Sequence, residues 1–162
     1  MNKNAFTILE VIIAIFILSL AGSGTFILIQ QTLIGASLNQ MQLTAYYLGQ
    51  EGAEIVRNIR DTNWLQRKED WKDGISLTSD YRLDYQSLEF PDTDCNLGAG
   101  NYLKYDGNFY NCFSGSETKF KRQIIVTDET DYLQVRVIVG WSDRGKDYSV
   151  EVINHLYNWY DI

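Results

Sequence analysis

The apolar and polar positions divide the chain into an N-terminal part with helical character and a C-terminal part with strand character. Residues 11–29 are nineteen uncharged, mostly apolar residues. As a helix rising 1.5 Å per residue they extend about 28 Å, close to the hydrocarbon thickness of a bilayer. We therefore predict that this segment spans a membrane.

An apolar stripe continues beyond that segment, with spacings that alternate between four and three residues. Such a heptad pattern places apolar side chains on one face of a helix. No proline occurs before Pro91, so one helix from about Phe6 to about Arg60 is allowed. Gly22 and Gly24 are its weak point, because glycine has low helix propensity. The stripe comprises Ile34, Leu38, Met41, Ala45, Leu48, Gly52, Ile55 and Ile59.

After the helix, apolar residues alternate with a period of two, as half-buried strands require. A short hairpin is predicted over 102–110, with a two-residue turn at Asp106 and Gly107. Turns at 127–131 and 143–146 favour an antiparallel meander. Longer strands are predicted at residues 75–85, 120–126, 133–141 and 148–156. The fold class is therefore α+β, a long N-terminal α-helix packed against a small antiparallel β-sheet.

Charge and residue content argue against several classes of function. A net charge of -7 disfavours nucleic-acid binding, which needs a cationic surface. The single histidine, His155, has no assignable serine or cysteine nucleophile, so no catalytic residue is predicted. Asp92, Asp94 and Asn96 alternate as in a calcium loop, but Leu97 stands where an EF-hand needs glycine. An irregular calcium site stays open, and we predict no metal site and no cofactor.

The chain has two cysteines, Cys95 and Cys112. The apolar N-terminal segment argues for export, and disulfides persist outside the cytosol. A bridge would close a loop of about 16 residues and stabilise the fold by about 3 kcal/mol. We predict this disulfide, with free thiols as the alternative.

Glu10 is a single acidic residue in the most hydrophobic stretch of the chain. A carboxylate near the middle of a bilayer costs about 2.5–3.5 kcal/mol or more, and such residues are usually retained for function. We therefore expect Glu10 to have a partner that its own helix does not supply. The plainer interpretation is an ordinary anchor whose Glu10 reaches the lipid headgroups.

Residues 6–10 (FTILE), followed by the apolar run, resemble the N-terminus of type IV pilins and type II secretion pseudopilins. The resemblance implies that a prepilin peptidase cleaves between Ala5 and Phe6 and that the new N-terminal Phe6 is methylated. Thr7 and Glu10 then stand at the second and fifth mature positions and act in assembly. It also implies a pilin-like fold, in which a small antiparallel sheet lies on the C-terminal half of the helix.

The resemblance assigns the chain to a structural and assembly subunit of a fibre rather than to an enzyme. Its expected partners are other pilin or pseudopilin subunits, the prepilin peptidase, the inner-membrane assembly platform and the membrane itself. The expected parts are the leader 1–5, the membrane half 6–29 of the helix, its exposed half 30–60 and the β domain 61–162. Lys3 precedes the span, so the positive-inside rule places the N-terminus in the cytoplasm and the β domain outside, in a pilus or pseudopilus after assembly.

Departures from the common pattern favour a minor member of this family. Ala5 replaces the usual glycine before the cut, and Gly22 and Gly24 stand where major pilins carry a proline. The segment 47–52 and the valine-rich strand ending in Trp141 resemble PilV-like minor pilins and the minor pseudopilin I.

Two other functions are compatible with the sequence. The small residues Ser19 and Ala21 form a signal-cleavage pattern, and cleavage after Ala21 would release a secreted domain. An anchored binding or adhesion module is the second, with loops 91–102 and 111–117 contacting the ligand.

Overall fold

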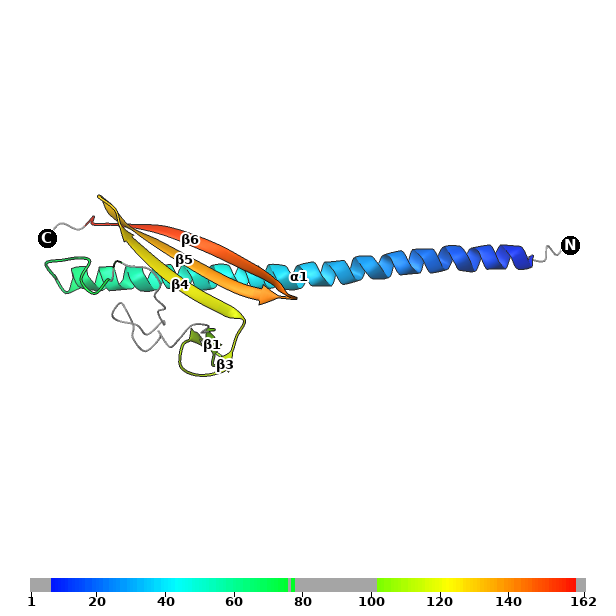
Figure 1. The fold of residues 1–162 in the computed structure, drawn as a ribbon, viewed down its shortest axis with the longest axis horizontal. Coiled ribbons are helices and arrows are strands. Elements are labelled where there is room, and N and C mark those ends of the chain that lie inside the picture. Colours follow the sequence, from blue (N-terminus) through cyan, green and yellow to red (C-terminus); the bar gives the residue numbers. More distant parts are fainter. Residues whose placement is uncertain (1–6, 76, 78–101, 160–162) are drawn as a thin grey trace. The chain divides into compact units, whose positions relative to one another are not determined.

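The computed structural model describes residues 7–75, 77 and 102–159. The chain divides into two compact units, Met1–Met41 and Gln42–Ile162, which are described separately below. The elements in chain order are α1 (Ile8–Leu65), β1 (Lys104–Tyr105), β2 (Tyr110–Asn111), β3 (Ser116–Glu117), β4 (Phe120–Asp128), β5 (Tyr132–Asp143) and β6 (Lys146–Tyr157) (Figure 1).

The first unit contains the N-terminal part of α1. No residue of α1 before Ala45 is buried. The helix is continuous through Gly22 and Gly24, the positions predicted to be its weak point. On either side of Gly24, the hydroxyls of Ser23 and Thr25 donate hydrogen bonds to backbone carbonyls one turn back. These bonds satisfy the polar groups of both side chains within an otherwise apolar segment.

In the second unit, α1 buries one broad face. The predicted stripe is confirmed between Ala45 and Ile59, whereas Ile34 is exposed. The buried face is wider than a heptad seam, because a second row of residues beside the stripe is also covered. The buried helical residues are Ala45, Leu48, Gly49, Gly52, Ala53, Ile55, Val56, Ile59, Arg60, Asn63 and Trp64.

The helix ends at Leu65, five residues later than predicted. Its end is a Schellman motif in which Arg67 adopts the left-handed conformation, with φ of 54°. The Arg67 N–H donates to the Trp64 carbonyl, and the Lys68 N–H donates to the Asn63 carbonyl, both at 3.0 Å. Glycine usually occupies this position, so Arg67 gives no sequence signal for the helix end. The end was predicted too early because the apolar stripe stops at Ile59 and residues 61–63 (DTN) were interpreted as a loop.

The larger sheet is the antiparallel meander β4-β5-β6, as predicted. Figure 1 shows its three strands lying along the C-terminal part of α1. Alternate side chains of β5 from Leu133 to Trp141 are buried, in agreement with the predicted strand. Arg144 and Gly145 form the two-residue turn into β6, both with positive φ, as a type I′ turn requires.

The smaller sheet has the order β2-β1-β3. The predicted hairpin is present, but its loop is longer than the predicted two-residue turn, because Tyr105 pairs with Tyr110. The Asp106 carboxylate accepts hydrogen bonds from the N–H groups of Phe109 and Asn108, both at 2.8 Å. These two bonds hold the Asp106 pKa below its usual value near 3.8. The short strand β3 was not predicted.

One predicted strand, residues 75–85, lies mostly outside the described residues. Ile75 is buried and Leu77 is exposed, and neither belongs to a strand. The remaining architecture confirms the α+β class with a pilin-like arrangement, one long N-terminal helix and small antiparallel sheets.

Candidate functional site

The start of α1 carries the residues that the sequence singled out. Thr7 is the N-cap: its hydroxyl oxygen accepts a hydrogen bond from the Glu10 N–H at 3.3 Å, and its carbonyl accepts one from the Val11 N–H at 3.2 Å. Thr-x-x-Glu is the sequence signature of a capping box. The capping-box pattern at Thr7 and Glu10 is therefore a second sequence signal for the helix start, separate from the resemblance of residues 6–10 to pilins.

The Glu10 carboxylate lies in the first turn of α1 and is exposed. Among the described residues, no lysine or arginine forms an ion pair with it. A negative charge at a helix N-terminus is favourable because it complements the helix dipole. Ala5 and Phe6, the predicted cleavage and methylation residues, lie outside the described residues. The Glu10 carboxylate is therefore free to pair with a cation that lies outside the described residues or on another molecule.

The helix that carries Glu10 is long and apolar enough to cross a membrane by length and composition. An 18-residue window of α1 has a mean hydropathy of 2.5 and none of it is buried. Such exposure of apolar side chains is unstable in water and calls for an apolar environment. These properties fit a membrane-anchored protein with a single span.

Residues 1–26 match the family model of the prokaryotic N-terminal methylation motif. No curated protein and no solved structure matches the chain. The motif indicates a prepilin-peptidase substrate of the type IV pilin and pseudopilin type, a class that is structural rather than enzymatic. The resemblance drawn from residues 6–10 is therefore supported at the level of this class.

Two glycines allow α1 to approach the larger sheet closely. A β-carbon at Gly49 would lie 2.7 Å from Val152 Cγ2, and one at Gly52 would lie 2.9 Å from Val137 Cγ1. Both distances are shorter than real contacts allow, so a larger residue would push helix and sheet apart. Gly52 was predicted as part of the stripe, whereas Gly49 was missed because it lies in the second buried row, beside the narrow stripe.

An ion pair joins β4 to α1 beneath the sheet. The Arg122 side chain is 1% exposed, and its Nη1 donates to Glu51 Oε1 at 2.9 Å and to the Leu48 carbonyl at 3.2 Å. Strand alternation predicted that Arg122 points inward. Its partner was not predicted, because Glu51 lies 71 positions earlier in the chain.

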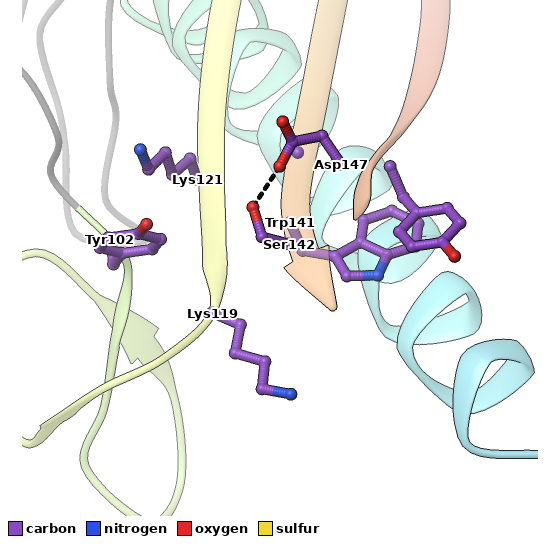
Figure 2. Close-up of a pocket in the computed structure, with 8 residues that line it drawn as sticks. Tyr102, Lys119, Lys121, Trp141, Ser142 and Asp147 are labelled. Atoms are coloured by element: carbon purple, nitrogen blue, oxygen red, sulfur yellow. Dashed lines mark hydrogen bonds between the residues drawn. The ribbon is translucent and has the colours of Figure 1, made fainter. Parts of the chain in front are cut away.

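A pocket of about 250 Å³ opens near the end of β5 (Figure 2). Lys121 Nζ lies 4.4 Å from the centre of the Tyr102 ring, and Lys119 Nζ lies 2.9 Å from Asp143 Oδ1. Figure 2 marks a hydrogen bond between Ser142 and Asp147. The lining residues are Tyr102, Lys119, Lys121, Gly140, Trp141, Ser142, Asp147 and Tyr148.

The remaining residues considered from the sequence form no common site. His155 is exposed on β6 and packs against the Tyr132 ring, with 4.5 Å between ring centres. Cys112 is half-buried after β2, whereas Cys95 lies outside the described residues, so their disulfide stays a prediction. The candidate calcium loop at 92–96 also lies outside them, and no group of potential metal ligands occurs in the part described.

Proposed function

We propose that this chain is a minor, PilV-like pilin or pseudopilin, a structural and assembly subunit of a type IV pilus-like or type II secretion fibre. The methylation motif at residues 1–26, heading a 58-residue helix with an exposed apolar half, carries this proposal. Prepilin peptidase removes residues 1–5 by cleavage between Ala5 and Phe6, and the new N-terminal Phe6 is methylated.

In this proposal the mature chain has a cytoplasmic N-terminus and an extracytoplasmic domain. Residues 6–29 span the membrane, 30–60 form the exposed half of the helix, and 61–162 form the β domain. Cys95 and Cys112 are paired, as the oxidising compartment allows. The subunit meets the inner-membrane assembly platform and then other pilin or pseudopilin subunits. No enzymatic activity, metal or cofactor is part of this function.

The assembly step depends on Glu10. Cleavage creates a terminal amine on Phe6, a cation in or near lipid, where opposite charges attract strongly. Glu10 of the incoming subunit pairs with the terminal amine of a neighbouring subunit, which compensates two charges that are costly to leave alone. Thr7 supports this role by fixing the start of the helix, so that the Glu10 carboxylate projects from the first turn.

Replacing Glu10 by Ala tests this role. Glu10→Ala keeps the membrane span, so the protein should accumulate in the membrane at the normal level. Its incorporation into fibres should fall at least tenfold, because a costly unpaired amine remains at the contact. Immunoblotting of sheared fibre and membrane fractions measures both quantities.

Glu54→Ala is the matched control, because it removes a carboxylate from an exposed position of the same helix. It should leave incorporation unchanged. Normal incorporation of the Glu10→Ala protein would show that the pairing is not needed for assembly.

A further inference from the structure

The strand β6 forms one edge of the larger sheet. It pairs with β5 along its whole length, and the part of the chain that the structure describes places no strand on its other side (Figure 1). An edge strand presents a row of backbone N–H and C=O groups that another extended chain can pair as a ladder. The free edge of β6 is therefore a surface on which a further strand can bind.

Proteins usually protect a long edge strand with prolines, bulges, charged side chains or a covering loop. β6 has 12 residues and no proline, and it pairs with β5 without a bulge. Between Tyr148 and Tyr157 its only Asp, Glu, Lys or Arg is Glu151, which already pairs with Arg136 of β5 at 3.0 Å. Ile153, in the middle of the strand, is 51% exposed. The edge therefore has little of the usual protection against pairing.

The described residues that flank 78–101 both contact β4, at the opposite edge of the sheet. Shortly before this stretch, Lys72 pairs with Asp128 at the end of β4, at 2.7 Å. Directly after it, the centre of the Tyr102 ring lies 4.4 Å from Nζ of Lys121, near the start of β4. β5 separates β4 from β6. We therefore look for the partner of β6 in another chain.

The side chains of β6 that face away from α1 are self-complementary about Ile153. When two copies pair in antiparallel fashion about this residue, Ile153 of each copy lies opposite Ile153 of the other. Glu151 then lies opposite His155 of the second copy, and the two-fold axis repeats this contact. A histidine ring N–H can donate to a carboxylate, and side chains directly opposite each other in a ladder interact. One strand sequence thus supplies both sides of the contact.

We propose that the free edge of β6 binds β6 of a second copy of this chain, antiparallel and centred on Ile153. The two three-stranded sheets then form one continuous sheet. On the inner face, the half-buried Val152 is covered further by Asn154 of the second copy. The pairing involves the second unit alone and does not rest on the proposed function.

This contact differs from one between neighbours along a fibre. Within the second unit α1 and β6 run in the same direction, because Gly49 approaches Val152 and Arg60 bonds the Tyr157 carbonyl. The two-fold axis therefore sets residues 42–65 of the two copies in opposite directions. Subunits along one helical fibre share a direction, so in the proposed function the β6 contact joins copies on two different fibres.

Disulfide trapping of the full chain in detergent, at less than one chain per micelle, tests the pairing. Ile153→Cys should give a disulfide-linked dimer under mild oxidation, because the two-fold axis places both cysteines opposite each other. Thr127→Cys is the matched control, since it is exposed on the same face of the sheet but on β4. It should give about tenfold less dimer. The unsubstituted chain accounts for the two native cysteines.

A charge exchange tests the register. His155→Glu, combined with Ile153→Cys, places two carboxylates opposite each other and should lower the trapped dimer about fivefold. Adding Glu151→His exchanges the two side chains and should restore the dimer. The proposal is overturned if no dimer forms through residue 153, if residue 127 gives as much, or if His155→Glu has no effect.

Amide exchange of the unsubstituted chain gives a second test that needs no cysteine. Alternate amides of β6 should exchange more slowly as the chain concentration rises, because their N–H groups enter the new ladder. If all amides of β6 already exchange slowly in the dilute monomer, the chain covers this edge itself, and the proposal is wrong.

Discussion

The two halves of α1 have the same backbone structure and opposite surroundings. Residues 8–41 are apolar on all sides over most of their length and bury none of their side chains. Residues 42–65 are apolar on one face only, and the larger sheet covers that face. A helix that is hydrophobic all round needs a nonpolar environment, whereas an amphipathic helix needs one packing partner. The fold therefore covers the apolar face of the second half only. The apolar side chains of the first half must be covered by a bilayer or by other subunits.

Truncating one isoleucine in each half should give the largest contrast. Ile55 is 8% exposed, and Ile55→Ala should lower the free energy of unfolding of the domain by about 3 kcal/mol because it leaves a cavity. Ile15 is 60% exposed, and Ile15→Ala should change the free energy of unfolding by less than about 0.5 kcal/mol. Denaturant unfolding of the detergent-solubilised chain, followed by tryptophan fluorescence, measures both. Equal effects would contradict the different surroundings of the two halves.

Removing the acidic partner of Arg122 should have the next largest effect. Glu51→Ala leaves a buried guanidinium without its carboxylate, and should cost about 2 kcal/mol because Glu51 is itself partly exposed. Glu54→Ala, one turn away in sequence, breaks only a surface pair with Arg57 and should cost less than about 0.5 kcal/mol. Unfolding curves of the two variants compare the contribution of the buried ion pair with that of the exposed one. An unchanged free energy of unfolding for Glu51→Ala would show that the ion pair does not stabilise the packing of β4 on α1.

The glycines of the two halves give the smallest and most specific contrast. Gly52→Ala brings a methyl group within 2.9 Å of Val137 and should lower stability by about 1–2 kcal/mol, despite the better helix propensity of alanine. Gly35→Ala meets nothing within 4 Å and should leave the domain unchanged. Unfolding midpoints compare the pair. If Gly52→Ala raised the unfolding midpoint, the space between helix and sheet would be large enough for a β-carbon.

Much of this fold was predictable because its strongest signals are local. Strand alternation placed Phe120, Arg122 and Ile124 on the buried side of β4, as observed. The heptad stripe located the covered face of α1 between Ala45 and Ile59. It underestimated the width of that face, because a helix lying on a sheet buries more of its circumference than a coiled-coil seam does.

The features that were missed depend on contacts between distant residues or on side-chain hydrogen bonds. Asn63 lies beyond the predicted helix end near Arg60, yet it is helical and 2% exposed. Its side-chain amide donates to the carbonyls of Trp71 and Asp73, which ties the following loop to the helix end. Tertiary contacts of this kind override weak helix propensity. Of the candidate site, the motif at residues 6–10 was evident from the sequence. The pocket could not be predicted, because its lining residues come together only when β4 pairs with β5.

The proposed function requires that α1 is synthesised as the N-terminal segment of a prepilin, and the identity of the mature N-terminal residue tests this requirement most directly. The full-length chain should be expressed with a prepilin peptidase and its N-terminal peptide identified by mass spectrometry. We expect residues 1–5 to be absent and the mature chain to begin with N-methylated Phe6. A mature chain that begins at Met1 would indicate a plain anchor, and one that begins at Gly22 would indicate a secreted domain. Either result would show that the chain is not processed as a prepilin.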